Sequence, residues 1–133
     1  MTLASTPAVA LTDEQRWSID LSVAQYLRSA RAVVEAQERL AQLGVSSDEL
    51  LRRRRAESAD RGIARLLRLA VTLIITRGRL DRADRRRLPP GASEATIHAV
   101  VAATAEAYAR VLVAESAAPA GSRPAIDMNV GDY

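Results

Sequence analysis

The sequence contains no cysteine, no lysine and no phenylalanine. Without cysteine the chain forms no disulfide, has no thiol nucleophile and builds no cysteine-based zinc site. Aromatic residues make up only 3%, so a core would consist of Leu, Val, Ile and above all Ala. Each of these side chains buries little area, and such a core is often completed by a partner subunit. We therefore expect the chain to self-associate.

The excess of positive over negative charge is also small. All 19 basic residues are arginine and they oppose 16 acidic residues, which leaves a formal net charge of only +3. A balance this close to neutral gives little overall attraction to nucleic acid.

Long apolar runs and targeting signals are missing as well. The most apolar run, Leu66 to Ile75, is interrupted by Arg68 and is shorter than the roughly 20 residues that span a bilayer. No basic residue precedes Arg16, so the start does not resemble the charged region of a signal peptide. We expect a cytoplasmic protein with no membrane association.

A long first helix is predicted between Thr12 and Gly44. Thr12 and Gln15 have the spacing of a capping box, and Gly44 is a typical helix stop. The apolar residues between them recur at helical spacing on one face. This face comprises Ile19, Val23, Tyr26, Leu27, Ala30, Val33, Val34 and Ala41.

A second capping box, Ser46 to Glu49, begins a very polar helix. Four consecutive arginines, Arg52, Arg53, Arg54 and Arg55, follow and extend most of the way round a helix. We expect this segment to be largely solvated or to bind something acidic. The pattern leaves open whether 47–77 forms one helix or two.

The segment from Ile63 to Ile75 is apolar around most of its circumference. A helix of this kind is buried in a core or an interface, so we place it at the centre of the fold. Pro89 and Pro90 then break the chain, and Ser93 caps a last helix. One face of that helix carries Ile97, Val100, Val101, Thr104, Tyr108, Val111 and Leu112.

These patterns predict an all-α fold, a three- to four-helix antiparallel bundle with flexible N- and C-terminal arms. The predicted helical domain covers 12–115, between an arm at 1–11 and a tail at 116–133.

Catalytic and metal-binding patterns are sparse. His98 is the only histidine, and no Ser lies in a nucleophile elbow near it. Glu94 shares a helix face with His98, but a single pair of this kind is common on helices. No glycine-rich phosphate loop occurs. We expect no enzymatic activity, no cofactor and no metal.

Two arginine clusters could bind phosphates or carboxylates. The first is Arg52 to Arg55, and the second contains Arg77, Arg79, Arg82, Arg85, Arg86 and Arg87. Asp81 and Asp84 lie within the second cluster and reduce its field. We favour solvated faces over a nucleic-acid surface.

The segment Gly91 to Ile97 resembles the turn and the start of the recognition helix in helix-turn-helix regulators. The resemblance implies that the first residues of the last helix read bases. Pro89 and Pro90 depart from that pattern, and residues 99–109 contain no Asn, Gln or Lys to read bases.

Two further features suggest contacts with a partner. Trp17 lies off the apolar face of the first helix, so either the chain or a second subunit should cover it. The C-terminal segment regains spaced anchors that could dock as an extended peptide. These anchors are Ile126, Met128, Val130 and Tyr133.

Taken together, the sequence predicts a non-enzymatic helical protein-interaction module: an adaptor, an assembly factor or a structural component. We expect a homo-oligomer that also binds other protein chains. The alternative is a DNA-binding transcriptional regulator that uses the arginine clusters and the segment 91–97.

Overall fold

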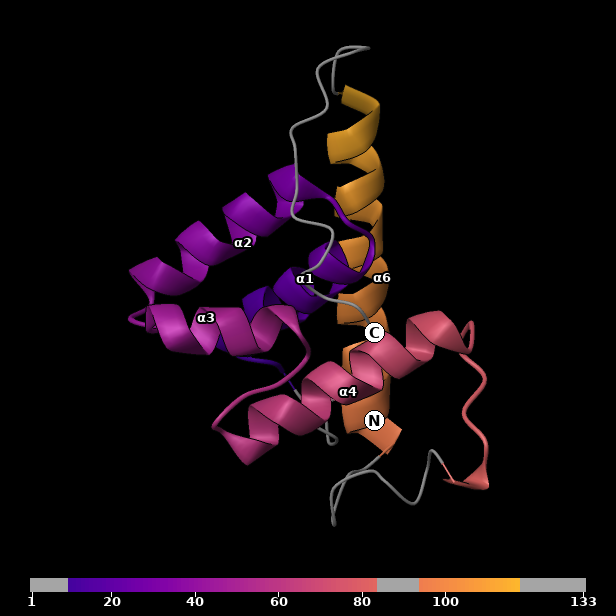
Figure 1. The fold of residues 1–133 in the computed structure, drawn as a ribbon. Helices are drawn as coiled ribbons and strands as arrows, with labels where there is room; N and C mark the ends of the chain where they lie inside the picture. Colours follow the sequence, from indigo (N-terminus) through magenta and orange to yellow (C-terminus); the bar gives the residue numbers. More distant parts are fainter. Residues whose placement is uncertain (1–9, 84–93, 118–133) are drawn as a thin grey trace, which may run out of the picture.

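The computed structural model describes residues 10–83 and 94–117, and no strand occurs in these ranges. The all-α bundle predicted from the sequence is confirmed (Figure 1). Its helices are α1 (Asp13–Tyr26), α2 (Ala30–Gln42), α3 (Ser47–Arg54), α4 (Arg61–Ile75) and α6 (Glu94–Ala117). The predicted arm and tail lie outside the described residues, apart from Ala10 and Leu11 at one end and Ser116 and Ala117 at the other.

The single long helix predicted between Thr12 and Gly44 is wrong, because the chain breaks after Tyr26. Arg28 adopts the left-handed conformation (φ 59°) that usually falls to glycine at a helix end. The Ser29 side chain then accepts from the Ala32 N–H and caps α2. The predicted ends are right, since Thr12 forms the capping box with Gln15 and α2 finishes two residues before Gly44.

The region that the sequence left open, 47–77, contains two helices. Ser46 caps α3, and Asp60 caps α4 by accepting from the N–H groups of Gly62 and Ile63. Between the helices the chain turns at Ala56, whose φ is 58°. The second capping box is only half formed, because the Glu49 side chain bonds to Ser58, Ala59 and Arg53.

Helix α1, not the segment from Ile63 to Ile75, lies at the centre of the fold. It packs against α2, α3, α4 and α6, whereas α4 packs mainly against α1 and α6. Its buried residues, Ser18, Ile19, Leu21, Ser22, Val23, Ala24 and Gln25, extend around the helix. Small side chains such as Ser18 and Ser22 allow neighbouring helices to approach α1 closely. The central position of α1 could not be predicted from how apolar each helix is.

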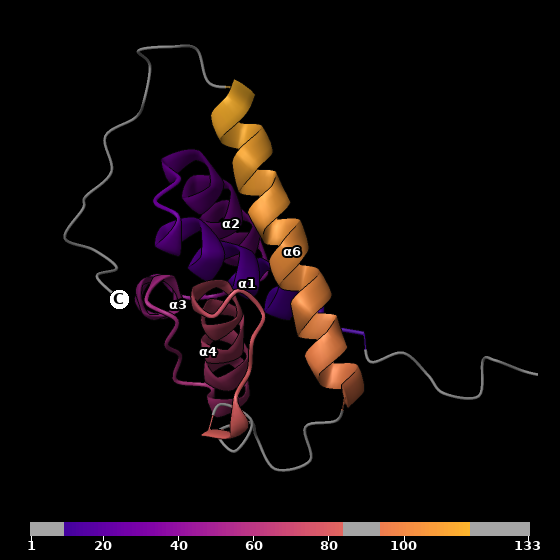
Figure 2. The same cartoon turned by 90° about the vertical axis from the view of Figure 1, so that its right-hand side faces the viewer.

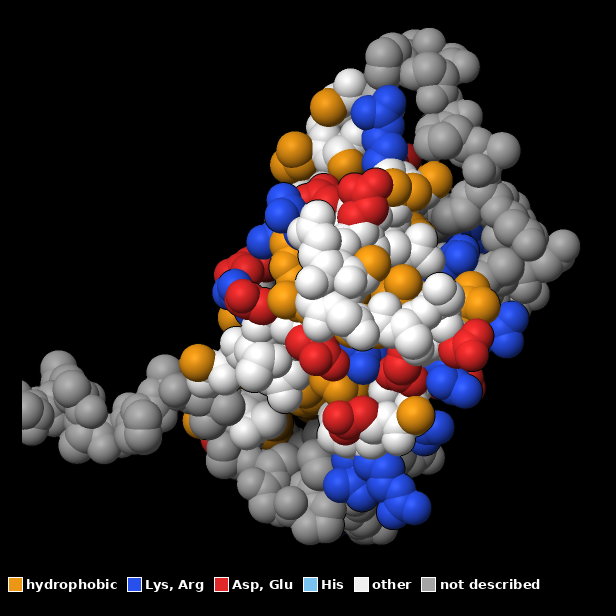
Figure 3. Space-filling view, turned by 90° about the vertical axis from the view of Figure 1, so that its left-hand side faces the viewer, with side chains coloured by type: hydrophobic (Ala, Val, Ile, Leu, Met, Phe, Trp, Pro, Cys, Tyr) orange, Lys and Arg blue, Asp and Glu red, His pale blue; other side chains and the backbone are white. Residues whose placement is uncertain are grey.

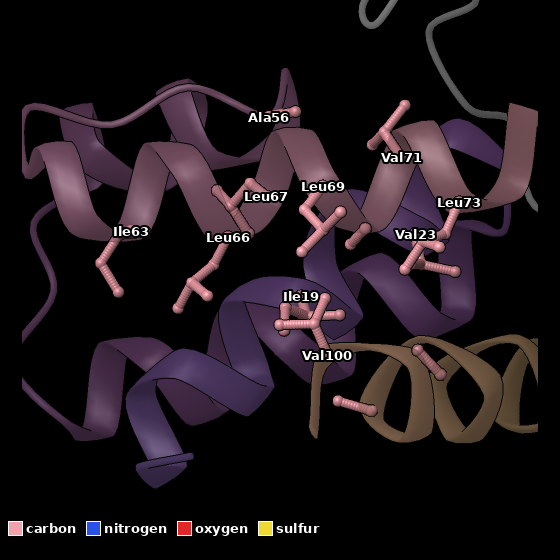
Figure 4. Close-up of a cluster of buried hydrophobic side chains, with 13 residues drawn as sticks. Ile19, Val23, Ala56, Ile63, Leu66, Leu67, Leu69, Val71, Leu73 and Val100 are labelled. Carbon is pink, nitrogen blue, oxygen red and sulfur yellow. The ribbon is translucent and has the colours of Figure 1, made fainter. Parts of the chain in front are cut away.

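Two apolar clusters form the core on either side of α1. The larger one joins α1 to α4 and α6, and Figure 4 shows Leu66 and Leu69 pointing towards Ile19 and Val100. The smaller one joins α1 to α2 and, through Val111, to α6. Helix α6 therefore closes both halves of the core.

The arginine cluster of α3 is not wholly solvated, because Arg53 is buried with 4% of its surface exposed. Its Nε donates to Glu49 at 2.7 Å, and its Nη1 donates to Ser18 at 2.9 Å and pairs with Glu14 at 3.0 Å. The Ser22 hydroxyl in turn donates to the Arg53 carbonyl oxygen at 2.6 Å. Arg53 thus anchors the polar helix α3 to α1.

Glu49 has the ionised form that this network needs. Burial opposes its ionisation, but donors from Ala59, Ser58 and Arg53 outweigh burial and lower its pKa to about 2. The carboxylate therefore connects α3 to the segment that leads into α4.

Replacing Arg53 with alanine should lower the free energy of unfolding by about 3 kcal/mol, because it removes a buried guanidinium and leaves the partly buried Glu49 carboxylate without it. Urea denaturation followed by circular dichroism measures this loss. Arg52→Ala is the matched control: its side chain is 50% exposed, so the change should stay within about 0.5 kcal/mol. Equal losses in the two variants would contradict the anchoring role of Arg53.

Candidate protein interface

Helix α6 lies along one side of the other helices and leaves much of its own surface open (Figure 2). Its buried face consists of Ile97, Val100, Ala103, Thr104, Ala107 and Val111. The sequence predicted that Val101, Tyr108 and Leu112 share that face, and this is wrong. They are 43%, 41% and 58% exposed.

The exposed apolar residues of α6 follow a regular spacing. Val101, Ala105, Tyr108 and Leu112 are separated by four, three and four residues, which places them in one line along the helix. We call these four residues the α6 stripe. The apolar arc of α6 is therefore wider than one core face, and the part that the fold does not cover forms this stripe.

A groove runs beside the α6 stripe and encloses about 480 Å³. We call it the α6 groove. It is lined by Leu27 just after α1, by Leu73 and Ile74 of α4, by Arg77 and Gly78 just after α4, and by Val101, Thr104, Ala105 and Tyr108 from α6. Three residues of the stripe thus form one wall, and apolar side chains of α4 and α1 form the other. Arg77 is the one charged residue among the described residues of the lining.

Helix α6 is also long and apolar enough to cross a membrane, unlike the segment 66–75. In its most apolar 18-residue window, 33% of the residues are buried inside the protein. The same length and composition occur in core helices of soluble proteins, so this property alone does not place α6 in a bilayer.

Trp17 is partly buried, and its ring is contacted from within the chain. The guanidinium carbon of Arg110 lies 5.0 Å from the ring centroid and that of Arg39 lies 5.7 Å from it, distances at which cations attract the ring face. The ring also packs beside the smaller core cluster. The chain's own arginines therefore supply part of the cover that the sequence predicted.

Asp20 lies next to Trp17 and Arg110, and its side chain is 14% exposed. Arg110 Nη1 donates to Asp20 Oδ2 at 2.8 Å. Burial raises the pKa of Asp20 to about 6, because desolvation outweighs the attraction of Arg110 and because Glu106 and Glu35 repel the charge. A space of about 40 Å³ lies beside these groups, enough for a water but not for an organic ligand.

The structure divides the first arginine cluster. Arg53 is buried and Arg54 is partly buried, with its Nε donating to Gln25 Oε1 at 2.9 Å. Arg52 and Arg55 are exposed, and Arg52 lies 3.5 Å from Glu49. Figure 3 shows acidic and basic side chains mixed over the face where α2 and α3 lie. The four arginines therefore do not form one basic surface.

The other candidate binding residues lie partly inside and partly outside the described residues. Arg77, Arg79 and Arg82 are exposed, whereas Arg85, Arg86 and Arg87 lie outside the described residues. The same holds for the tail anchors Ile126, Met128, Val130 and Tyr133, and for 91–93 of the helix-turn-helix-like segment. Within its described part, Ile97 faces the core.

Metal chemistry finds no support among residues 10–83 and 94–117, where no group of three His, Asp or Glu side chains could hold an ion. No family model, curated protein or solved structure matches the chain at a significant level. Its function therefore has to be argued from its own surface.

The raised pKa of Asp20 gives a testable pH dependence. The folded state holds this proton more tightly than the unfolded chain does, so the stability that it contributes is present below pH 3.8 and is lost as the pH rises towards about 6. Asp20→Asn removes the ionisation. The wild type should therefore lose about 2 kcal/mol of unfolding free energy between pH 4 and pH 7 that the variant does not lose.

Denaturant titrations of both proteins at the two pH values measure this difference. If the difference in unfolding free energy between the two proteins is the same at both pH values, burial does not raise the pKa of Asp20.

Proposed function

We propose that this chain is a non-enzymatic helical protein-interaction module that self-associates and serves as an adaptor, an assembly factor or a structural component. One observation carries the proposal: the α6 stripe and the α6 groove form a continuous apolar surface beside the core. Contiguous exposed apolar patches on soluble proteins typically mark sites of protein association.

The shape of this surface favours a helical ligand. The stripe repeats every three or four residues, which is the spacing at which two helices interlock side chains. The groove beside it is open to solvent, and most of its lining side chains are apolar. Protein helices with an apolar face fit such a groove, whereas a polar metabolite finds in its described lining only Arg77, Thr104 and the hydroxyl of Tyr108 as polar groups on side chains.

The charged residues of α6 support the same interpretation. Between residues 99 and 114 only Glu106 and Arg110 are charged. Arg110 is directed to Asp20 and Trp17, and Glu106 lines the small space beside them, away from the stripe. The α6 stripe itself therefore carries no charge that association would have to desolvate, and Arg77 is the charged side chain beside it in the groove.

The alternative, a DNA-binding regulator, loses support from the positions of its arginines. Two of the four residues in the first cluster are engaged with α1, and Ile97 of the helix-turn-helix-like segment packs into the core. A recognition helix would present that turn to the major groove. We therefore favour protein association over nucleic-acid binding.

Leu112→Glu should weaken self-association by at least about 100-fold. Each copy loses an apolar contact of roughly 1.5–3 kcal/mol, and the loss occurs twice in a symmetric dimer. Sedimentation velocity over a concentration series measures the effect. The wild type should show a mass above the 14.4 kDa of one chain, and the variant should shift to one chain.

Leu51→Glu is the matched control, since Leu51 on α3 is 54% exposed and Leu112 is 58% exposed. It should self-associate like the wild type. A wild type that sediments as a single chain at every concentration would reject self-association through this surface.

A further inference from the structure

The α6 stripe is complementary to itself when two copies run antiparallel. We propose that the chain forms a symmetric dimer in which α6 packs against α6 of a second copy, centred between Glu106 and Ala107. This inference rests on the proposed self-association and adds its partner, direction and register.

The register follows from the spacing of the stripe. In an antiparallel pair centred between 106 and 107, each residue faces the one whose number brings the sum to 213. Val101 then faces Leu112 of the second copy, and Ala105 faces Tyr108 of the second copy. These layers correspond to the alternating positions that face each other in an antiparallel coiled coil.

Size complementarity supports this register. The smallest residue of the stripe, Ala105, meets the largest, Tyr108, and two medium aliphatic side chains meet in the outer layers. Pairing small with large side chains across facing positions fills the space between helices without voids. A parallel in-register pair would instead place Tyr108 on Tyr108 and Ala105 on Ala105, which crowds one layer and leaves the next one empty.

Small residues also flank the stripe. Ala102 and Ala109 are exposed on its outer side, and the antiparallel register brings them near each other across the axis. Helix axes approach to about 8 Å only where the contacting side chains are small. These alanines therefore allow the second α6 to come close enough for the stripe residues to interlock.

Complementary polar side chains lie at the ends of the contact. One turn before Val101 the stripe continues to His98, and one turn after Leu112 it continues to Glu115, and both are exposed. The same register places His98 opposite Glu115 of the second copy, which joins a donor to a carboxylate. Ser29 already holds Glu115 Oε2 at 2.9 Å, so this carboxylate is positioned before association.

The α6 groove provides room for the second helix. Its wall formed by Leu73 and Ile74 lies beside the stripe, so a helix packed on the stripe also contacts the end of α4. The two-fold axis repeats this contact on the other copy. The interface thus comprises the stripe together with the groove, on both chains.

Cysteine cross-linking tests the register directly, because the chain contains no cysteine of its own. Val101→Cys and Leu112→Cys are made separately and each is treated with a mild oxidant or a short bis-maleimide, alone and as an equimolar mixture. The antiparallel register brings position 101 to position 112 of the second copy. It separates 101 from 101 of the second copy by about 16 Å along the axis.

We expect the covalent dimer to be at least about tenfold more abundant in the mixture than in either variant alone, a contrast set by that spacing. Both positions are about half exposed, so thiols there leave the core intact, which circular dichroism verifies. The control mixture pairs Leu112→Cys with Leu51→Cys, an equally exposed position on α3, and should give only the background of random collisions.

Each other outcome overturns the register, the interface or the self-association. Cross-linking of Val101→Cys alone at the level of the mixture indicates a parallel pair and overturns the register. No specific cross-link, with wild-type sedimentation above one chain mass, overturns this interface but leaves the proposed self-association intact. No cross-link together with a single-chain mass overturns both.

Discussion

The buried guanidinium of Arg53 is the interaction on which the position of α3 between α1 and α4 depends. Helix α3 has no other buried residue, so apolar packing alone does not hold it in place. Arg53 connects it to Ser18 and Glu14 of α1, and Glu49 connects it to Ser58, just before the cap of α4. A buried cation is stable only when hydrogen bonds and opposite charges surround it, so these groups specify one position for α3.

Apolar surface is distributed unevenly around this polar junction. Helix α1 is enclosed by its neighbours, while α6 covers two core clusters with one face and leaves the α6 stripe uncovered. The difference arises from position, because α1 lies between the other helices and α6 lies along their outside (Figure 2). The surface proposed for association is therefore exposed because α6 lies on the outside of the bundle.

The sequence predicts the helical class, most helix starts and the apolar character of α4, because caps and periodicity are local properties. It does not predict the break at Arg28, since a left-handed arginine has no signature in a single sequence. Nor does it predict the burial of Arg53, because the partners Glu14 and Ser18 lie far away in the chain. The stripe was missed for a related reason: periodicity marks which residues of α6 share a face, but not which face the core covers.

The contacts that hold α6 in place close very long loops. Asp20 bonds to Arg110 across 90 positions, and Ser29 bonds to Glu115 across 86. Loops of this length form late in folding, because their closure entropy is lost before the contacts compensate for it. Synthesis runs from the N-terminus, so α1 to α4 leave the ribosome before α6 does. The helix that carries the α6 stripe therefore leaves the ribosome after the helices against which it packs.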